Sequence, residues 1–113
     1  MIQNENKILG LIGIAKKAGK IVTGTEMTVE AVRNGGHNSK KGVKLLLCSA
    51  DASETTIKKV KNAAEYYKIP FYILGADKDE LARITGNRGG QISAVGILDG
   101  GFAEAIRGYI ENN

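Results

Sequence analysis

Three lysines in the first quarter of the chain have the type and spacing needed to bind an anion. Lys16, Lys17 and Lys20 precede Gly24 and Thr25, where a helix is expected to begin. The first turn of a helix presents unpaired backbone amides and the positive end of the helix dipole, which together favour a phosphate. Such contacts hold a nucleic-acid backbone without reading its bases. In the other interpretation, the lysines only balance the dipole at the end of the preceding helix.

The charge of the chain is compatible with an anionic partner. The 113 residues have a formal net charge of +4. Residues 1–61 contain 11 basic and 5 acidic side chains, whereas residues 62–113 contain 5 basic and 7 acidic ones. A basic half on a small domain favours RNA as the partner, although surface charge also serves solubility.

Motifs for catalysis, metals or cofactors are weak. Cys48 lies in an apolar run and is interpreted as a small core residue, and it cannot form a four-ligand zinc site with His37, the one histidine. Residues 13–20 resemble a nucleotide-binding loop, but the glycine spacing is wrong and no strand precedes them. We therefore expect no enzymatic activity and no cofactor. The single cysteine also indicates a reducing, cytoplasmic setting.

The elements that must position the lysines alternate between helix and strand. Helical spacing of apolar residues, with caps and glycines at the ends, predicts helices at 5–18, 25–34, 51–67, 78–84 and 102–110. Short apolar runs predict strands at 20–22, 43–48, 71–74 and 92–98. The run 43–48 is typical of a central strand that is buried on both faces. This order predicts one domain, 1–113, built as a three-layer α/β/α sandwich.

Several side chains receive structural interpretations. In the second helix Thr25 is expected to be the cap, and Met27, Val29 and Val32 are expected to point inward. A solvated helix face is expected for Lys58, Lys59 and Lys61. Acids that favour a helix dipole are expected at Asp77, Asp79 and Glu80. Core or rim positions are expected for Tyr66, Tyr67 and Tyr72.

Several stretches of the chain resemble a known protein family. They are residues 16–24, 30–35 and 45–53, and residues 67–71 and 79–81 fit the same pattern. In order and spacing they resemble the kink-turn-binding ribosomal protein family, often called L seven Ae / L thirty e. The resemblance covers nearly the whole chain and is closest to the small bacterial members of the YlxQ type.

The resemblance implies both a fold and a function. The implied fold is an α/β/α sandwich with a four-stranded mixed sheet. The implied function is non-catalytic binding of structured RNA, such as a kink-turn, in a ribosomal or translational setting and without a cofactor. Family members contact RNA at the start of the second helix, in the loop before the last strand and after the first helix. The matching positions here are Lys16, Lys17, Lys20, Gly24, Thr25, Glu26, Met27, Glu30 and Arg88.

The motif at the second helix departs from the family pattern. Gly24 matches, but Glu26 and Met27 stand where the family has Asn-Glu, and Glu30 stands where it has Lys. A carboxylate repels phosphate, although it can accept a hydrogen bond from a guanine or cytosine amino group. The loop 86–91 lacks the family's apolar cover and offers Arg88 instead.

Other features and functions stay open at this stage. Lys40 and Lys41 lie in a loop that is longer than the family's usual turn, and they are either an added RNA contact or solvated. One alternative function is a protein-interaction module with a decayed kink-turn site, docked on a ribosomal or translation-factor partner. Another is an accessory domain for methyl transfer, since related sandwiches accompany RNA methyltransferase domains.

Overall fold

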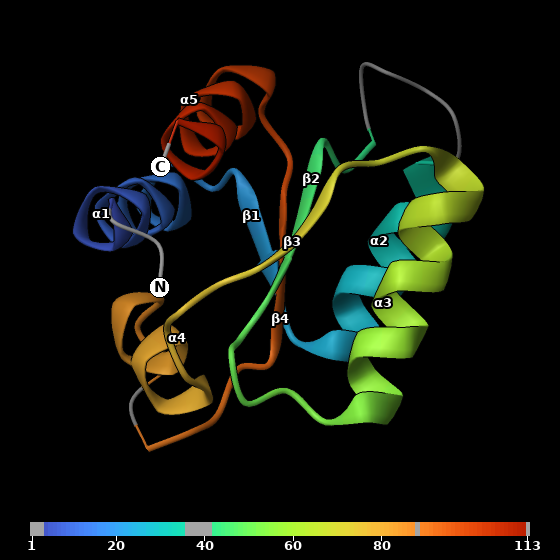
Figure 1. Ribbon diagram of the computed structural model, residues 1–113, viewed down its shortest axis with the longest axis horizontal. Helices are drawn as coiled ribbons and strands as arrows, with labels where there is room; N and C mark the ends of the chain where they lie inside the picture. Colours follow the sequence, from blue (N-terminus) through green and yellow to red (C-terminus); the bar gives the residue numbers. More distant parts are fainter. Residues whose placement is uncertain (1–3, 36–41, 88, 113) are drawn as a thin grey trace.

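The computed structural model describes residues 4–35, 42–87 and 89–112, in which helices and strands alternate (Figure 1). The helices are α1 (Glu5–Lys17), α2 (Thr25–Gly35), α3 (Glu54–Tyr67), α4 (Lys78–Ile84) and α5 (Gly100–Glu111). The strands are β1 (Ile21–Thr23), β2 (Leu45–Cys48), β3 (Phe71–Ile73) and β4 (Ala94–Ile97). The predicted order is confirmed. The second and fourth strands are shorter than predicted because their pairing covers only Leu45 to Cys48 opposite Ile97 to Ala94.

The four strands form one mixed sheet in the order β1-β4-β2-β3. β4 pairs antiparallel with both β1 and β2, and β2 pairs parallel with β3. This is the four-stranded mixed sheet that the family resemblance implies. β4 and β2 are the inner strands, and all their residues are buried.

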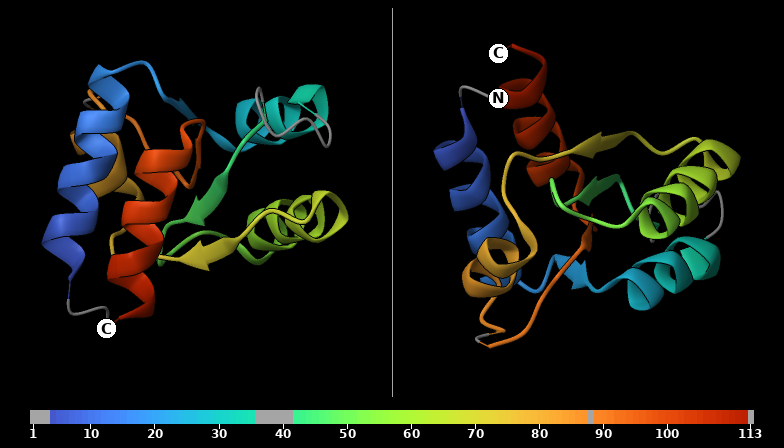
Figure 2. Two further views of the ribbon diagram at one scale, coloured as in Figure 1. Left: turned by 90° about the horizontal axis from the view of Figure 1, so that it is seen from above. Right: turned by 60° about the horizontal axis from the view of Figure 1, so that its bottom comes forward.

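The two faces of the sheet are covered by different helices, as the views in Figures 1 and 2 show. Side chains of a strand alternate between its faces, and β2 uses both. Leu45 and Leu47 pack with α1, α4 and α5, whereas Leu46 and Cys48 pack with α2 and α3. The predicted three-layer sandwich is therefore confirmed.

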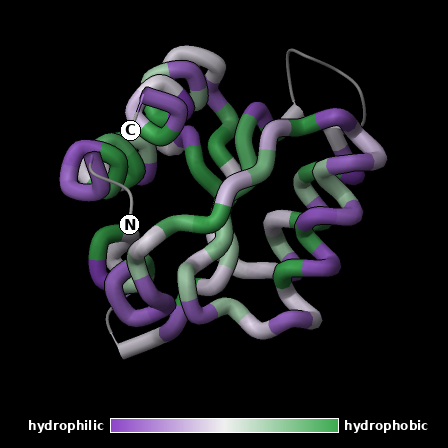
Figure 3. Tube along the Cα trace, viewed as in Figure 1, coloured by the Kyte–Doolittle hydropathy of each residue, from purple (hydrophilic) through white to green (hydrophobic). Residues whose placement is uncertain are grey.

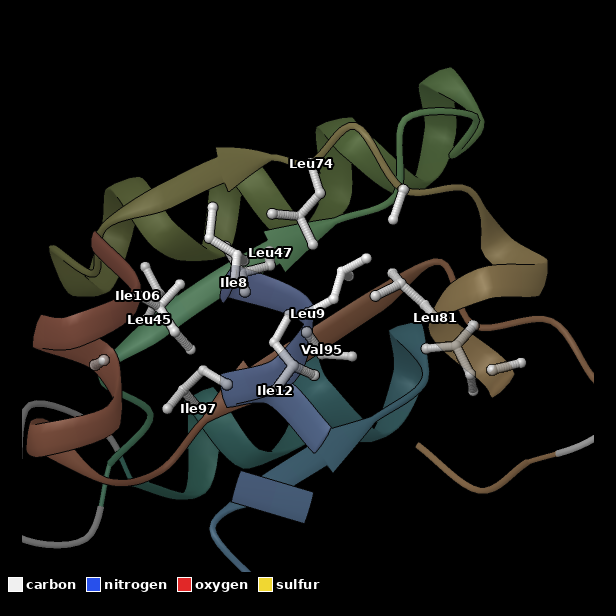
Figure 4. Close-up of a cluster of buried hydrophobic side chains, with 14 residues drawn as sticks. Ile8, Leu9, Ile12, Leu45, Leu47, Leu74, Leu81, Val95, Ile97 and Ile106 are labelled. Atoms are coloured by element: carbon white, nitrogen blue, oxygen red, sulfur yellow. The ribbon is translucent and has the colours of Figure 1, made fainter. Parts of the chain in front are cut away.

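The core beneath α1 is the larger of the two clusters of buried side chains. Figure 4 shows Ile8, Leu9 and Ile12 of α1 pointing toward the strand residues. Ile14, on the other side of α1, is 55% exposed, so this helix is less buried than its composition indicates. Figure 3 shows the corresponding alternation of hydrophilic and hydrophobic residues along the outer helices.

The core on the other face requires a glycine in β4. A Cβ atom built on Gly96 would lie 3.0 Å from Val22, 3.2 Å from Val43 and 3.3 Å from Thr28, in each case from a side-chain carbon. These three side chains come from β1, from the segment before β2 and from α2. Their shared approach to Gly96 holds α2 close against the sheet.

The start of α2 differs from the sequence prediction. Thr25 is the first residue of the helix and Gly24 precedes it, with a φ of +95° that side-chain-bearing residues rarely adopt. Met27 is 61% exposed, so the prediction that it points inward is wrong. Thr28 is fully buried instead, because the helix is rotated to place it over Gly96.

Three other helices begin with a side-chain cap. Ser53, Asp77 and Asp99 each accept a hydrogen bond from the backbone N–H of the third residue onward. The interpretation of Asp77 as an acid that stabilises a helix start is thereby confirmed, with a distance of 2.8 Å to the amide of Glu80.

Cys48 lies in the core beneath α2 and α3. Burial raises the pKa of its thiol to about 11, so the thiol stays protonated near neutral pH. Its interpretation as a core residue is confirmed. Across residues 4–35, 42–87 and 89–112, the His, Cys, Asp and Glu side chains form no group of three that could hold a metal ion. None of the helices in these ranges is long and apolar enough to cross a membrane.

We expect Leu46→Ala to lower the free energy of unfolding by about 2–5 kcal/mol, because it opens a cavity at a fully buried position. The measurement is chemical denaturation followed by circular dichroism. Ile14→Ala is the control, and its cost should stay within about 0.5 kcal/mol because the side chain is exposed. A cost below about 1 kcal/mol for Leu46→Ala would contradict its central place in the core.

A pair of glycine variants tests the backbone at the start of α2. At neither Gly24 nor Gly10 would a Cβ meet any atom within 4 Å. We expect Gly24→Ala to cost about 1–3 kcal/mol because of its positive φ. Gly10→Ala lies inside α1 and should stabilise the protein by about 0.5–1 kcal/mol. If the two variants change the melting temperature equally, a side chain at position 24 does not strain the backbone.

Candidate nucleic-acid interface

The lysine cluster consists of Lys16, Lys17 and Lys20, at the junction between α1 and β1. The left-handed Gly19 (φ +71°) turns the chain, and the amide of Lys20 donates to the carbonyl of Ala15 at 2.8 Å. All three lysine side chains are exposed. No acidic side chain in the described part of the chain lies within salt-bridge distance of them. Their charges are thus available to an external anion.

β1 connects the lysine cluster to the start of α2. At one end the carbonyl of Lys20 accepts from the amide of Leu98 at 2.8 Å, and at the other the amide of Gly24 donates to the carbonyl of Ala94 at 2.9 Å. A strand rises about 3.3 Å per residue, so about 13 Å separates Lys20 from Gly24. One nucleic-acid backbone can reach both places.

The segment between α4 and β4 lies beside the start of α2, because Gly24 binds the first residue of β4. Hydrogen bonds tie this segment back to α4: the amide of Asn87 donates to Ala82 at 2.8 Å, and that of Ile92 donates to Lys78 at 3.1 Å. Figure 2 (right) shows the end of α1, β1, this segment and the start of α2 along the lower edge of the molecule. Three separate parts of the chain therefore form one surface.

A hollow of about 890 Å³ adjoins this surface, lined by Asp79, Arg83, Gly89, Gly90 and Gln91. The Nε2 atom of Gln91 donates to Asp79 at 3.3 Å, which closes one side of the hollow. The Arg83 side chain is 67% exposed and lies 3.5 Å from Glu80, a surface ion pair worth little energy. Arg83 was not among the predicted site residues. In the sequence it was indicated only by its position in the last turn of a helix that is followed by a loop.

The two acidic residues of α2 are not equivalent. Both are exposed, but Glu26 in the first turn forms a salt bridge with Lys59 of α3, whereas Glu30 in the middle of the helix has no salt-bridge partner in the described part of the chain. Lys58 and Lys61 are exposed, as predicted for a solvated face, and Lys59 is partly exposed, with 39% of its side chain accessible and its ammonium group on Glu26. The pairing partly neutralises Glu26, so the charge opposing an anion here is smaller than the sequence indicates.

The predicted site residues fall into two groups in the structure. Those that the structure describes lie at the α1–β1 junction, at the start of α2 or, for one glutamate, in the middle of α2; they are Lys16, Lys17, Lys20, Gly24, Thr25, Glu26, Met27 and Glu30. Arg88, Lys40 and Lys41 lie outside the described residues. The exposed side chain of Met27 offers an apolar surface in the first turn of α2, at a position predicted to be in the core.

Comparisons with known proteins agree with this architecture. The family model described as "Ribosomal protein L7Ae/L30e/S12e/Gadd45 family" matches residues 6–107. A protein of Enterococcus faecium named "RNA-binding protein YlxQ" is 38% identical over 108 residues, covering 96% of this chain and 95% of that protein. A protein of the same name from Bacillus subtilis (strain 168) is 33% identical over 102 residues, covering 85% and 87%.

Two solved structures have the same fold. A Bacillus halodurans protein, described as having unknown function, superimposes with a TM-score of 0.80 at 32% identity, covering 93% of this chain and 97% of that one. The Giardia lamblia 15.5kD RNA binding protein superimposes with a TM-score of 0.71 at 21% identity, covering 95% and 87%. The resemblance seen in the sequence, including its closeness to YlxQ-type members, is confirmed. The chain belongs to the ribosomal protein L7Ae/L30e/S12e/Gadd45 family.

Proposed function

We propose that this protein binds structured RNA at the edge formed by the lysine cluster, the start of α2 and the α4–β4 segment. The observation that carries the proposal is the arrangement of three exposed lysines, of which Lys20 is separated by about 13 Å of strand from the free amides of a helix start. Lysines attract phosphates as point charges, and a helix start adds directed N–H donors. The names of the relatives, both "RNA-binding protein YlxQ", support the same function.

The finer proposal concerns the kind of RNA and the setting. A bent RNA fits a surface made of separate segments, and here the start of α2, with the exposed Met27, is hydrogen-bonded through Gly24 to the end of the glycine-containing α4–β4 segment. A kink-turn-like element of a ribosomal or messenger RNA is the proposed ligand, in a cytoplasmic and translational setting. The protein acts by binding, with no catalytic step.

Replacement of Lys16, Lys17 and Lys20 together by Gln should weaken binding to every RNA sequence. Each lost phosphate contact should reduce the slope of log affinity against log salt by about 0.7–0.9. The measurement is a titration of labelled RNA at several salt concentrations. Lys58→Gln with Lys61→Gln is the control, since these residues lie beside a different hollow on α3. A larger loss per charge in the control would place the RNA on the other side of the molecule.

A second candidate function, docking on a ribosomal or translation-factor protein, is favoured by the exposed Glu30. An exposed carboxylate on α2 attracts a basic protein surface and repels a phosphate. The absorbance ratio at 260 and 280 nm of protein purified without nuclease separates the two functions. An RNA binder should carry nucleic acid at low salt and lose it at high salt, whereas a protein-docking module should carry none at either.

The acids also yield a test of kink-turn recognition. Glu26→Asn with Glu30→Lys should improve the free energy of binding to a kink-turn by about 2–4 kcal/mol, since the repulsion of about 1 kcal/mol from Glu30 becomes an attraction, while Glu26→Asn supplies an amide contact and releases Lys59 from its salt bridge. This corresponds to about 30- to 1,000-fold in affinity. A duplex without the kink should gain far less, since it receives only the charge term. Equal gains for the two RNAs at one salt concentration would contradict recognition of the kink.

A further inference from the structure

The outer edge of β3 lies apart from the proposed interface and is open. In the described part of the chain β3 pairs with β2 alone, at the end of the sheet. Figure 1 shows β3 in front of the other strands with no helix across it, and Figure 2 (right) shows it on the side opposite the edge proposed for RNA. An uncovered edge strand is a template on which another strand can pair.

The hydrogen bonds of β3 show which of its backbone groups are free. The carbonyl of Pro70 accepts from β2 at 2.9 Å, and the amide of Leu74 donates to β2 at 2.8 Å. Backbone groups of alternate residues in a strand point to the same side. The amides and carbonyls of Phe71 and Ile73 therefore point away from β2, and no other described segment forms a backbone hydrogen bond with them.

The most exposed side chain of this edge is apolar. Ile73 is 45% exposed, and it lies on the same face of the sheet as the half-buried Phe71, because the two residues are two apart in a strand. Phe71 packs with the core beneath α2 and α3. Edge strands are commonly protected from pairing by a charged side chain, and β3 has an isoleucine instead. This favours a partner that covers Ile73.

The segments at the two ends of β3 have opposite charge. Lys68 precedes the strand and is exposed. After the strand Asp77 is exposed, and Asp51 lies beside it, since its carboxylate accepts from the amide of Lys78 at 2.9 Å. This end is negative even when the charge of Lys78 is counted. When two copies of β3 run antiparallel, the basic end of each lies against the acidic end of the other, which is a complementary arrangement.

We propose that a second copy of this chain occupies the edge, with the two β3 strands paired antiparallel about a two-fold axis at Tyr72. Phe71 then lies opposite Ile73 of the other copy, and each of these two pairs exchanges both of its backbone hydrogen bonds. This register pairs every outward-pointing group of the two strands. It also places each Ile73 side chain beside an aromatic ring, a stabilising cross-strand pair.

The paired sheet would have eight strands, with a proposed RNA-binding edge at each end. β1 is the strand farthest from β3, so seven strand spacings, about 34 Å, separate the two β1 strands. The dimer could then hold two structured RNA elements at once. This consequence rests on the proposed function, whereas the pairing of the two copies does not.

A single cysteine tests the register. In the proposed dimer Tyr72 faces its own copy in a non-hydrogen-bonded pair, with about 4.5 Å between the Cα atoms, which suits a disulfide. Tyr72→Cys should therefore form a covalent dimer under mild oxidation. Ile73→Cys is the matched control: this position is more exposed, but it lies diagonally from its copy at about 7–8 Å, too far for a disulfide. The native Cys48 is buried and does not compete.

Sedimentation of the whole protein tests the pairing without a change at Tyr72. The parent should dimerise as its concentration rises. Ile73→Lys should raise the dissociation constant of the dimer about ten-fold, because each dimer contains the change twice at a cross-strand pair. Ile14→Lys, which changes an exposed isoleucine on α1, should leave that constant unchanged.

Three results would overturn the inference. They are a parent protein that stays monomeric at every concentration, dimers that Ile73→Lys does not weaken, and cross-linking of Ile73→Cys as fast as that of Tyr72→Cys. The edge of β3 would then be left to an extended segment of another protein. Because none of these measurements uses RNA, their failure would leave the proposed function standing.

Discussion

The close approach of three side chains to Gly96 is the constraint on which the position of the interface depends. Val22, Val43 and Thr28 come within 3.0–3.3 Å of the place where a Cβ would be. Because they belong to three different segments, this one missing side chain fixes β1, the entry to β2 and the first turn of α2 relative to one another. Two residues earlier in β4, Ala94 accepts the hydrogen bond from Gly24. The free amides at the start of α2 are therefore positioned by the contacts of this helix with the sheet.

The sequence was sufficient to predict the layers, because their periodicities are strong. The unbroken apolar run at β2 could belong only to a strand buried on both faces, and the structure leaves all four of its residues inaccessible. The rotation of α2 was harder to predict. Met27 is the more apolar of two neighbours, yet Thr28 is buried, because only a short side chain fits against Gly96. Packing of α2 against the sheet decided which of the two residues is buried, and the hydropathy of the residues does not predict this packing.

The candidate site was likewise predictable from the sequence only in part. The lysine cluster could be found from spacing alone because its residues are adjacent in sequence. The pair of Glu26 and Lys59, 33 positions apart, could not, since it depends on how α2 packs on α3. Arg83 was indicated only by its place in the last turn before a loop, because the hollow that it lines has walls from both α4 and the segment before β4. The long-range contacts therefore altered the prediction of the charge at the proposed interface more than the prediction of the fold.

The pairing of the first and last helices has a practical consequence for how the domain tolerates attachment. The Nδ2 atom of Asn4 donates to the carbonyl of Tyr109 at 3.2 Å, and the ammonium of Lys7 lies 5.4 Å from the centre of the Tyr109 ring. The two helix ends therefore lie together, about 20 Å of helix away from the lysines at the other end of α1. A covalent cross-link between α1 and α5 at this corner would tie the two helices together without reaching the lysines. A fluorophore attached at this corner would likewise stand clear of the proposed RNA-binding edge.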